Sequence, residues 1–296
     1  MSQSDVSRFD YVTVGHVTVD VLSSDGSRRP GGGAFYSALQ AARLGLRTLI
    51  VTKGRLEELQ QLLEPYREEL EVRLMPAEHT TTLATRWEGG TRRQRLLAWA
   101  GAIDEAIEVD TAILHLAAVA RETPSHWQGS AELVGVTPQG LLREWDDDGL
   151  ISLAPLDPHA IPAHFDALVL SEAELAHSRW LLASQADEGM ESQSTGSARV
   201  GNRALVAVTA GAQPTLVHLP DGTALETSVP AVAEPRDDLG AGDVFAAAFF
   251  VALHEGRSPT DAAAYGNAAA AVRVAGTGAQ AIGDRAAVSA MLQGAA

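Results

Sequence analysis

The sequence predicts an α/β sandwich with a mostly parallel central sheet. Short apolar runs bounded by Pro, Gly or polar clusters recur along the chain, which is typical of buried parallel strands. Helical patterns separate several of these runs, and such alternation favours an α/β architecture. The chain has 296 residues, of which 46% are hydrophobic and 20% are charged, so it can bury a substantial core.

Strands are expected where β-branched and aliphatic residues form short runs between turn-forming residues. Residues 80–87 and 92–99 are strand-like and are separated by Gly89 and Gly90, which predicts a β-hairpin. The other expected strands cover residues 11–14, 17–22, 48–52, 112–118, 133–137, 168–170 and 205–209.

Helices are expected in three regions besides the apolar segment 244–253. Three glycines open the small-residue segment 34–44, which ends at Gly45 as helices often do. Residues 55–70 are amphipathic, with a break expected at Pro65. The alanine-rich residues 259–291 predict packed helices. The polar segment 184–202 predicts a mobile surface loop.

Composition and charge exclude several functions. The net charge of −16 disfavours binding to nucleic acid or to an anionic membrane surface. The chain has no cysteine, so disulfides and thiolate metal sites are excluded. Its nine histidines show no metal-binding spacing. The first ten residues contain no apolar run, and residues 244–253 are too few to cross a bilayer. We therefore expect a soluble cytoplasmic protein.

The segment 237–243 carries the most informative motif. Gly240, Ala241 and Gly242 form a small-residue turn that runs directly into a strongly apolar helix. Free backbone N–H groups and the helix dipole make such a junction an anion-binding site. Asp243 lies at this junction, and the dipole is expected to keep it ionised as a base for a substrate hydroxyl. The alternative is that Asp243 only caps the helix and the glycines only form a turn.

Two other nucleotide-binding motifs are missing. No Gly-x-x-x-x-Gly-Lys-Ser/Thr sequence occurs, which argues against a P-loop NTPase. The first expected strand is followed by Gly15-His16-Val17-Thr18, which lacks the Gly-x-Gly-x-x-Gly pattern of dinucleotide oxidoreductases.

The segment 237–243 resembles the C-terminal signature of the ribokinase-like, or PfkB, carbohydrate kinases, which usually reads Asp-Thr-x-Gly-Ala-Gly-Asp. This chain has Asp238 where Thr is usual. Residues 31–45 resemble the N-terminal signature in length and small-residue content, and the two stand in the expected order. The resemblance implies one ribokinase-like kinase domain over residues 1–296. Its fold would be a three-layer α/β/α sandwich with a small β lid from about 16–30 and 79–100.

The resemblance also implies roles for individual residues. ATP and Mg²⁺ would be the cofactors, with a monovalent cation as a further expectation, and Asp243 would be the catalytic base beside an anion hole of Gly240, Ala241 and Gly242. The implied substrate ligands are Asp20, Gly31, Gly32, Gly33, Tyr36 and Gln139. The implied nucleotide contacts are Thr209, Gly211, Asn267 and Gly278, with Glu174 as the metal ligand.

Several of these residues have structural alternatives. Asp20 could simply end a strand, the three glycines could only form a turn, and Glu174 could be a solvated helix residue. Asn267 could have a plain packing role. Arg143, in a stretch that resembles a further family motif, either reaches a phosphate or pairs with residues 146–148, and pairing is favoured.

Two departures from the family pattern bear on the substrate. Tyr36 falls where the family has a substrate-binding Asn, and Ser171 replaces the Asn of the Asn-x-x-Glu motif. We interpret them as signs of a divergent polyol or sugar substrate. The aromatic residue after the glycines resembles the pattern of the myo-inositol kinase branch of the family. A nucleoside kinase and a catalytically silent sugar- or nucleotide-binding protein remain alternatives. Exposed lid strands also suggest a homodimer.

Overall fold

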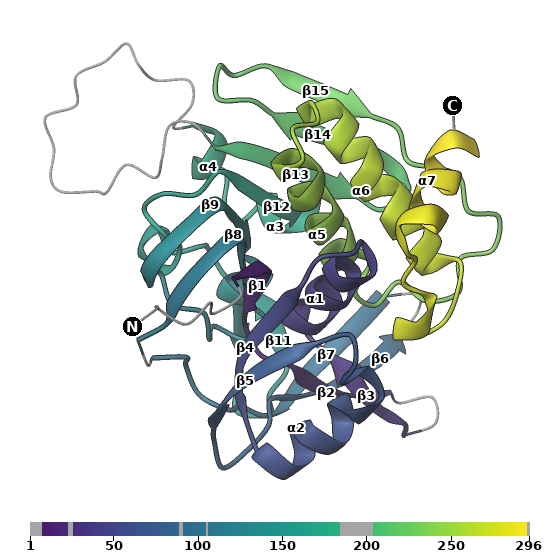
Figure 1. The fold of residues 1–296 in the computed structure, drawn as a ribbon. Helices are drawn as coiled ribbons and strands as arrows, with labels where there is room; N and C mark the ends of the chain where they lie inside the picture. Colours follow the sequence, from purple (N-terminus) through teal and green to yellow (C-terminus); the bar gives the residue numbers. More distant parts are fainter. Residues whose placement is uncertain (1–7, 23–25, 89–90, 105, 184–203, 295–296) are drawn as a thin grey trace, which may run out of the picture.

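A computed structural model describes residues 8–22, 26–88, 91–104, 106–183 and 204–294. Its largest feature is a nine-stranded sheet (Figure 1). The strands are β1 (Phe9–Val14), β4 (Thr48–Gly54), β5 (Glu71–Pro76), β8 (Glu108–Ala117), β9 (Gln128–Thr137), β12 (Ala167–Ser171), β13 (Leu205–Ala210), β14 (Gln213–His218) and β15 (Ala224–Thr227).

The strand order is β15-β14-β13-β12-β9-β8-β1-β4-β5. In this order, each neighbouring pair between β13 and β5 is parallel. At the other edge, β14 pairs antiparallel with both β13 and β15. The predicted fold class, with its mostly parallel sheet, is therefore confirmed. Strands β8 and β9 begin earlier than predicted because Glu108 pairs with Gln128 and extends the ladder beyond the apolar run.

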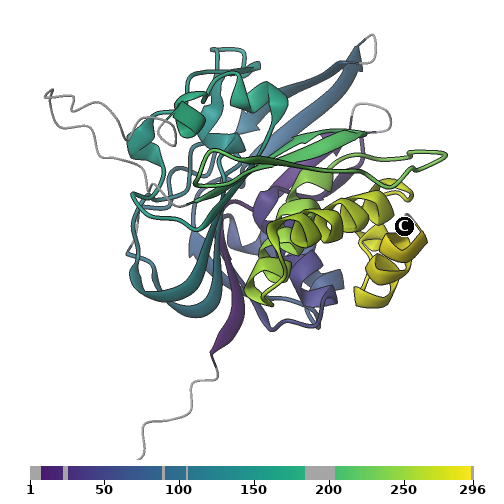
Figure 2. The same ribbon diagram turned by 90° about the horizontal axis from the view of Figure 1, so that it is seen from above.

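One face of the sheet is covered by long helices, seen at one side of the sheet in Figure 2. They pack through a large apolar core in which Gly135 makes room for Phe250, because a Cβ at Gly135 would lie 2.4 Å from that ring. The helices are α1 (Gly33–Arg43), α2 (Leu56–Leu63), α5 (Ala241–His254), α6 (Pro259–Val274) and α7 (Arg285–Gly294). A 3₁₀ turn at Glu64–Tyr66 follows α2, as the expected break at Pro65 predicts.

The opposite face is covered by shorter segments. Apolar side chains from the connections, including Ile103, Ile107 and Phe165, pack against the strands there. The short helices α3 (Glu172–Leu175) and α4 (Trp180–Ala183) follow β12. A two-stranded sheet of β10 (Arg143–Trp145) and β11 (Ile151–Leu153) follows β9.

A separate four-stranded sheet projects from the main one. Its strands are β2 (Thr18–Leu22), β3 (Arg28–Gly31), β6 (Thr82–Glu88) and β7 (Thr91–Ala98), in the order β3-β2-β6-β7. The glycines of the predicted hairpin turn between β6 and β7, and the loop predicted at 184–202, lie outside the described residues. Among the helices that are described, none is long and apolar enough to cross a membrane.

Candidate active site

The expected site residues gather at the carboxyl edge of the main sheet. From β1 the chain runs to β4 and β5 on one side, whereas β8, β9, β12 and β13 lie on the other. The strand order therefore reverses between β1 and β8, and open α/β sheets bind their ligands at such a switch point. Gln139, Glu174 and Gly211 each follow the carboxyl end of a strand on this edge.

The glycine turn before α1 brings two carboxylates together. A Cβ at Gly31 would lie 2.1 Å from Oδ2 of Asp20, and a Cβ at Gly33 would lie 2.9 Å from Oδ1 of Asp243. Gly32 has a φ of +89°, and a Cβ there would lie 2.3 Å from a backbone carbonyl. Side chains at these positions would displace both carboxylates, so glycine is required for the approach.

The start of α5 forms the small-residue turn that the sequence predicts as an anion-binding site, called the anion-binding turn below. Gly240 adopts a left-handed conformation with a φ of +77° and caps the helix. The N–H groups of Gly242 and Asp243 belong to the first turn, so they have no acceptor within the helix. Gly242 is exposed, and a Cβ there would have nothing within 4 Å. An anion can therefore approach these donors and the positive end of the helix dipole.

Asp243 differs from the sequence expectation in its protonation. Burial raises the pKa of Asp243 to about 7, the charge of Arg143 opposes this rise, and the charge of Glu174 adds to it. Loss of solvation opposes the helix dipole, so the expectation that Asp243 stays ionised applies only above about pH 7. A carboxylate with a pKa near neutrality is a stronger proton acceptor than an ordinary Asp.

This pKa predicts a pH dependence of turnover. The value of kcat/KM should fall about tenfold for each pH unit below 7 and level off above it, because only the ionised carboxylate accepts a proton. Measuring kcat/KM from pH 5 to pH 9 with saturating donor tests this. A rate that stays flat down to pH 5 would contradict the assignment of Asp243 as the base.

Stability offers a control that needs no activity. The native pKa of Asp243 lies above the ordinary value of 3.8, so the native state holds the proton more tightly than the unfolded state. Wild-type stability contributed by this group is therefore lost as pH rises from about 4 to about 7. The amide of the Asp243→Asn variant mimics the neutral acid, so this variant should melt progressively higher than the wild type over the same range.

Asp20 lies on β2 beside the glycine turn and is almost fully buried. The Thr18 hydroxyl donates to its Oδ1 at 2.8 Å. Burial raises the pKa of Asp20, and the hydrogen bond from Thr18 and the charge of Arg29 oppose the rise. A buried carboxylate beside the glycine turn is suited to accept hydrogen bonds from a polyol.

The ring of Tyr36 packs against the anion-binding turn. A Cβ at Gly240 would lie 2.3 Å from Cγ of Tyr36, so the ring packs directly against that glycine. The Tyr36 hydroxyl is buried, with no hydrogen-bond partner among the described residues. Burial raises the pKa of Tyr36 to about 12, and the negative charge of Asp20 adds to the rise. The aromatic residue that replaces the family's Asn therefore packs against the turn as well as facing Asp20.

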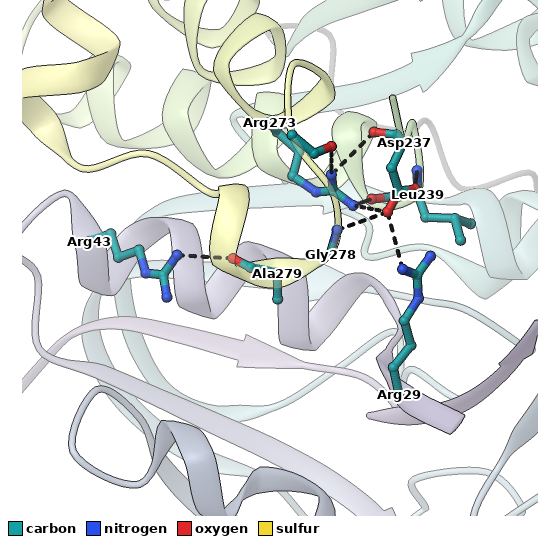
Figure 3. Close-up of polar contacts among 8 residues, drawn as sticks. Arg29, Arg43, Asp237, Leu239, Arg273, Gly278 and Ala279 are labelled. Atoms are coloured by element: carbon teal, nitrogen blue, oxygen red, sulfur yellow. Dashed lines mark hydrogen bonds and ion pairs between the residues drawn. The ribbon is translucent and has the colours of Figure 1, made fainter. Parts of the chain in front are cut away.

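A polar cluster that sequence reasoning missed surrounds Asp237 (Figure 3). Its Oδ2 accepts hydrogen bonds from Arg29 at 3.1 Å, from Arg273 at 3.0 Å and from the Gly278 N–H at 3.0 Å. Its Oδ1 accepts from the Leu239 N–H at 3.1 Å. Burial opposes ionisation, but the N–H groups and Arg273 outweigh it and lower the pKa of Asp237. The only local sign was one arginine in an alanine-rich helix.

Glu174 is a buried residue in α3. Its Oε2 accepts the N–H of Ser171 at 2.8 Å, and the Ser171 hydroxyl accepts the Glu174 N–H at 3.3 Å, which forms a capping box. Ser171 therefore has a structural role as the N-cap of α3. Within the described residues no group of three or more acidic or histidine side chains could hold a metal ion alone.

The favoured pairing of Arg143 with residues 146–148 is wrong. The Arg143 guanidinium is buried and donates to the Val119 carbonyl at 2.8 Å and to Oε1 of Gln94 at 3.0 Å. Burial lowers the pKa of Arg143, as does the charge of Arg92, whereas Glu174 and Asp243 raise it. The side chain thus turns inward and places its charge beside the carboxylates of the site.

The expected nucleotide contacts divide into two groups. Thr209 lies near the end of β13, and Gly211, with a φ of +63°, turns the chain into β14 with open space around it. Asn267 and Gly278 instead make contacts within the protein. Asn267 accepts from the Thr215 hydroxyl at 2.8 Å and donates to the Ser228 carbonyl at 3.1 Å, which is the packing role that the sequence left open.

Comparison with known proteins connects this geometry to a family. The profile described as pfkB family carbohydrate kinase matches residues 5–285. No curated protein matches the chain. Solved structures do match over nearly the whole chain, at identities that establish the fold alone.

Three of these solved structures span the range of descriptions. Arabidopsis thaliana ribokinase, complexed with ribose and ATP, is 18% identical, covers 97% of this chain and 99% of its own, and has a TM-score of 0.71. A variant of a pyrophosphate-dependent myo-inositol-1 kinase is 20% identical, covers 96% and 98%, and has a TM-score of 0.71. Methanocaldococcus jannaschii nucleoside kinase is 18% identical, covers 97% and 99%, and has a TM-score of 0.68.

Proposed function

This chain belongs to the PfkB family of carbohydrate kinases, which phosphorylate a hydroxyl group, and we propose that its donor is ATP and its acceptor a sugar or cyclitol. The observation that carries the proposal is the position of Asp243. Its carboxyl group lies against Gly33 at the start of α1 and in the first turn of α5, with a pKa of about 7. A base and an anion-binding turn are thus combined in one place.

The proposed reaction uses these groups together. Asp20 accepts hydrogen bonds from the acceptor's hydroxyls, and Asp243 takes the proton of the attacking hydroxyl. The N–H groups at Gly242 and Asp243 bind the transferring phosphoryl group, whose transition state is loose and highly charged. The small sheet would act as a lid over the acceptor, because β2 and β3 carry Asp20 and Gly31 and connect directly to α1.

The residues present suit the Mg²⁺ that the family resemblance implies, provided that phosphate oxygens supply most of its ligands. Mg²⁺ typically takes one or two carboxylates together with phosphate oxygens and water. Glu174 uses Oε2 in the capping box, while its Oε1 has no partner among the residues described. We assign Glu174 as the residue that would orient the ion. When bound, the ion would neutralise charge on the donor phosphates.

The rest of the ATP is proposed to lie along the C-terminal half of the carboxyl edge. Thr209 and Gly211 would border it, since the turn after β13 is open. Asn267 and Gly278 use their polar groups within the protein, so they would border the same region without donating hydrogen bonds to ATP. The cysteine-free chain suits a reducing compartment, and we place the proposed enzyme in the cytoplasm.

Homodimerisation through the lid strands also belongs to the proposal. Three large apolar side chains of that region are exposed, namely Trp87 by 48%, Leu97 by 56% and Trp99 by 40%. Exposed apolar residues on strands are suited to pairing with another copy.

Three variations on the function remain as candidates. The acceptor could be a nucleoside. The donor could be pyrophosphate, because solved structures of this fold are described as a pyrophosphate-dependent kinase complexed with a pyrophosphate analog and myo-inositol, and as a variant of a pyrophosphate-dependent myo-inositol-1 kinase. A silent binding protein on the same fold would explain the departures at Tyr36 and Ser171. It would not explain a base with a pKa near 7 beside the anion-binding turn.

A donor-by-acceptor panel tests the proposal. ADP or phosphate release is measured with Mg-ATP or Mg-pyrophosphate against myo-inositol, ribose, fructose and adenosine. We expect substrate-dependent turnover with ATP and one sugar or cyclitol. Turnover with adenosine alone would favour the nucleoside kinase, and turnover with pyrophosphate alone would replace the donor. Binding of ATP without turnover on any acceptor would favour the silent protein.

A further inference from the structure

Arg273, in the last turn of α6, is a fully buried arginine beside the anion-binding turn. Its Nη1 donates to the Asp237 carbonyl at 3.1 Å and to the Gly276 carbonyl at 3.4 Å. Its Nη2 donates to Oδ2 of Asp237 at 3.0 Å and to the Leu239 carbonyl at 2.7 Å. Three backbone carbonyls and one carboxylate thus surround a single positive charge.

This set of oxygens is chemically that of an alkali-cation site. Backbone carbonyls and carboxylates that converge on one point replace the water around a bare monovalent ion. The family resemblance raises the expectation of such a cation in this protein. The oxygens are already occupied by the guanidinium group, so the residues present do not fit an added ion at this position.

The guanidinium group holds the turn on which the proposed chemistry depends. Two of its acceptors, the carbonyls of Asp237 and Leu239, belong to the three residues before Gly240. The same group lies 5.7 Å from the ring of Tyr36, which packs beneath Gly240. The turn that precedes the first N–H groups of α5 is therefore held by the Arg273 hydrogen bonds on one side and by the Tyr36 ring on the other.

The Asp237 carboxylate also forms an ion pair with Arg29 of the small sheet. In Figure 3, Arg29 from β3 reaches the Asp237 carboxylate on the side opposite Arg273. The side chains of Arg273 and Asp237 are 0% and 8% exposed, so their ion pair is shielded from solvent. A loosely bound ion would exchange with solvent, whereas a covalently attached guanidinium cannot leave.

We propose that Arg273 is a built-in cation that takes the place of a monovalent ion, so that the turn forms without added K⁺ or Na⁺. Arg273 acts through the turn and is a positioning residue. The effect on turnover rests on the proposed kinase function, whereas the effect on folding does not. Because the two can be measured separately, failure of one is distinguishable from failure of the other.

The first test is thermal unfolding in KCl and in tetramethylammonium chloride at equal ionic strength, which keeps screening the same. Wild type should melt at the same temperature in both salts, within about 1 °C. Arg273→Ala leaves the three backbone carbonyls without a cation, while Arg29 still pairs with the Asp237 carboxylate, so the Tm of the variant in tetramethylammonium should fall by on the order of 10 °C. K⁺ should restore part of that loss by binding in the vacated space.

Arg43 provides the matched control. It donates to the carbonyl of Ala279 at 2.9 Å, close to the cluster but away from the turn (Figure 3). It also donates to the carbonyl of Ile282 at 2.8 Å. Arg43→Ala should also lower the Tm, but equally in both salts. If K⁺ rescues both variants alike, or neither, Arg273 has only an ordinary structural role and the proposal fails.

Turnover gives the second readout. Wild type should turn over equally in both salts, whereas Arg273→Ala in tetramethylammonium should lose about 10²-fold, since a misplaced turn misorients the reacting groups. K⁺ or millimolar guanidinium chloride should restore part of this rate, and Arg273→Lys should need neither. If Arg273→Ala does not fold, the wild type still decides, because a Tm or rate that rises specifically with K⁺ overturns the proposal.

Discussion

Asp243→Asn is expected to lower kcat by about 10²–10⁴-fold, because the amide cannot accept the proton of the attacking hydroxyl. The substitution keeps the size of the side chain and removes the cost of ionising a carboxyl group whose pKa is raised, so the protein should fold at least as well. ATP affinity should change little, since the first-turn N–H groups of α5 remain. The measurement is steady-state turnover with the acceptor identified by the panel, together with ATP titration.

Asp238→Asn is the matched control for this prediction. It makes the same chemical change five residues earlier, at an exposed side chain. Its turnover should stay within about twofold of wild type, because isolated surface charges contribute little. If Asp243→Asn retained more than a tenth of the wild-type rate, another group would have to take the proton, and the assignment of the base would be wrong.

The sequence was sufficient where the deciding residues are contiguous. The turn from Gly240 to Asp243 and the apolar helix that follows are local features, so their structure follows from dihedral freedom and periodicity. The parallel sheet was predictable for a similar reason, because strands buried on both faces read as continuous apolar runs. The polar first halves of β8 and β9 were missed, since only pairing between neighbouring strands defines them.

Long-range packing accounts for the rest. Arg273 lies 36 residues from Asp237, and Arg29 lies 208 residues from it, so no local pattern joins them. The inward turn of Arg143 and the raised pKa of Asp243 both result from burial by segments distant in sequence. A helix dipole can be inferred from a few residues, but the loss of solvent around a carboxylate depends on the whole fold.

Gly240→Ala is expected to damage both folding and turnover. The new Cβ would lie 2.3 Å from the ring of Tyr36, in a backbone with a φ of +77°. Left-handed strain and the clash together should cost about 2–4 kcal/mol of unfolding free energy. Gly45→Ala is the control, because its φ is +93° with nothing within 4 Å, so it carries the strain without the clash. Denaturant unfolding of both variants separates the two contributions.

Gly242→Ala should separate chemistry from stability. Its Cβ would meet no protein atom within 4 Å, and its unfolding free energy should stay within about 0.5 kcal/mol of wild type. The methyl group would nevertheless project from the first turn of α5, where the transferring phosphoryl group is proposed to bind. We therefore expect kcat/KM to fall about 10²-fold. Gly294→Ala, equally open but distant in α7, should leave both quantities unchanged. Wild-type turnover in Gly242→Ala would mean that the phosphoryl group does not approach this turn, whatever the role of Asp243.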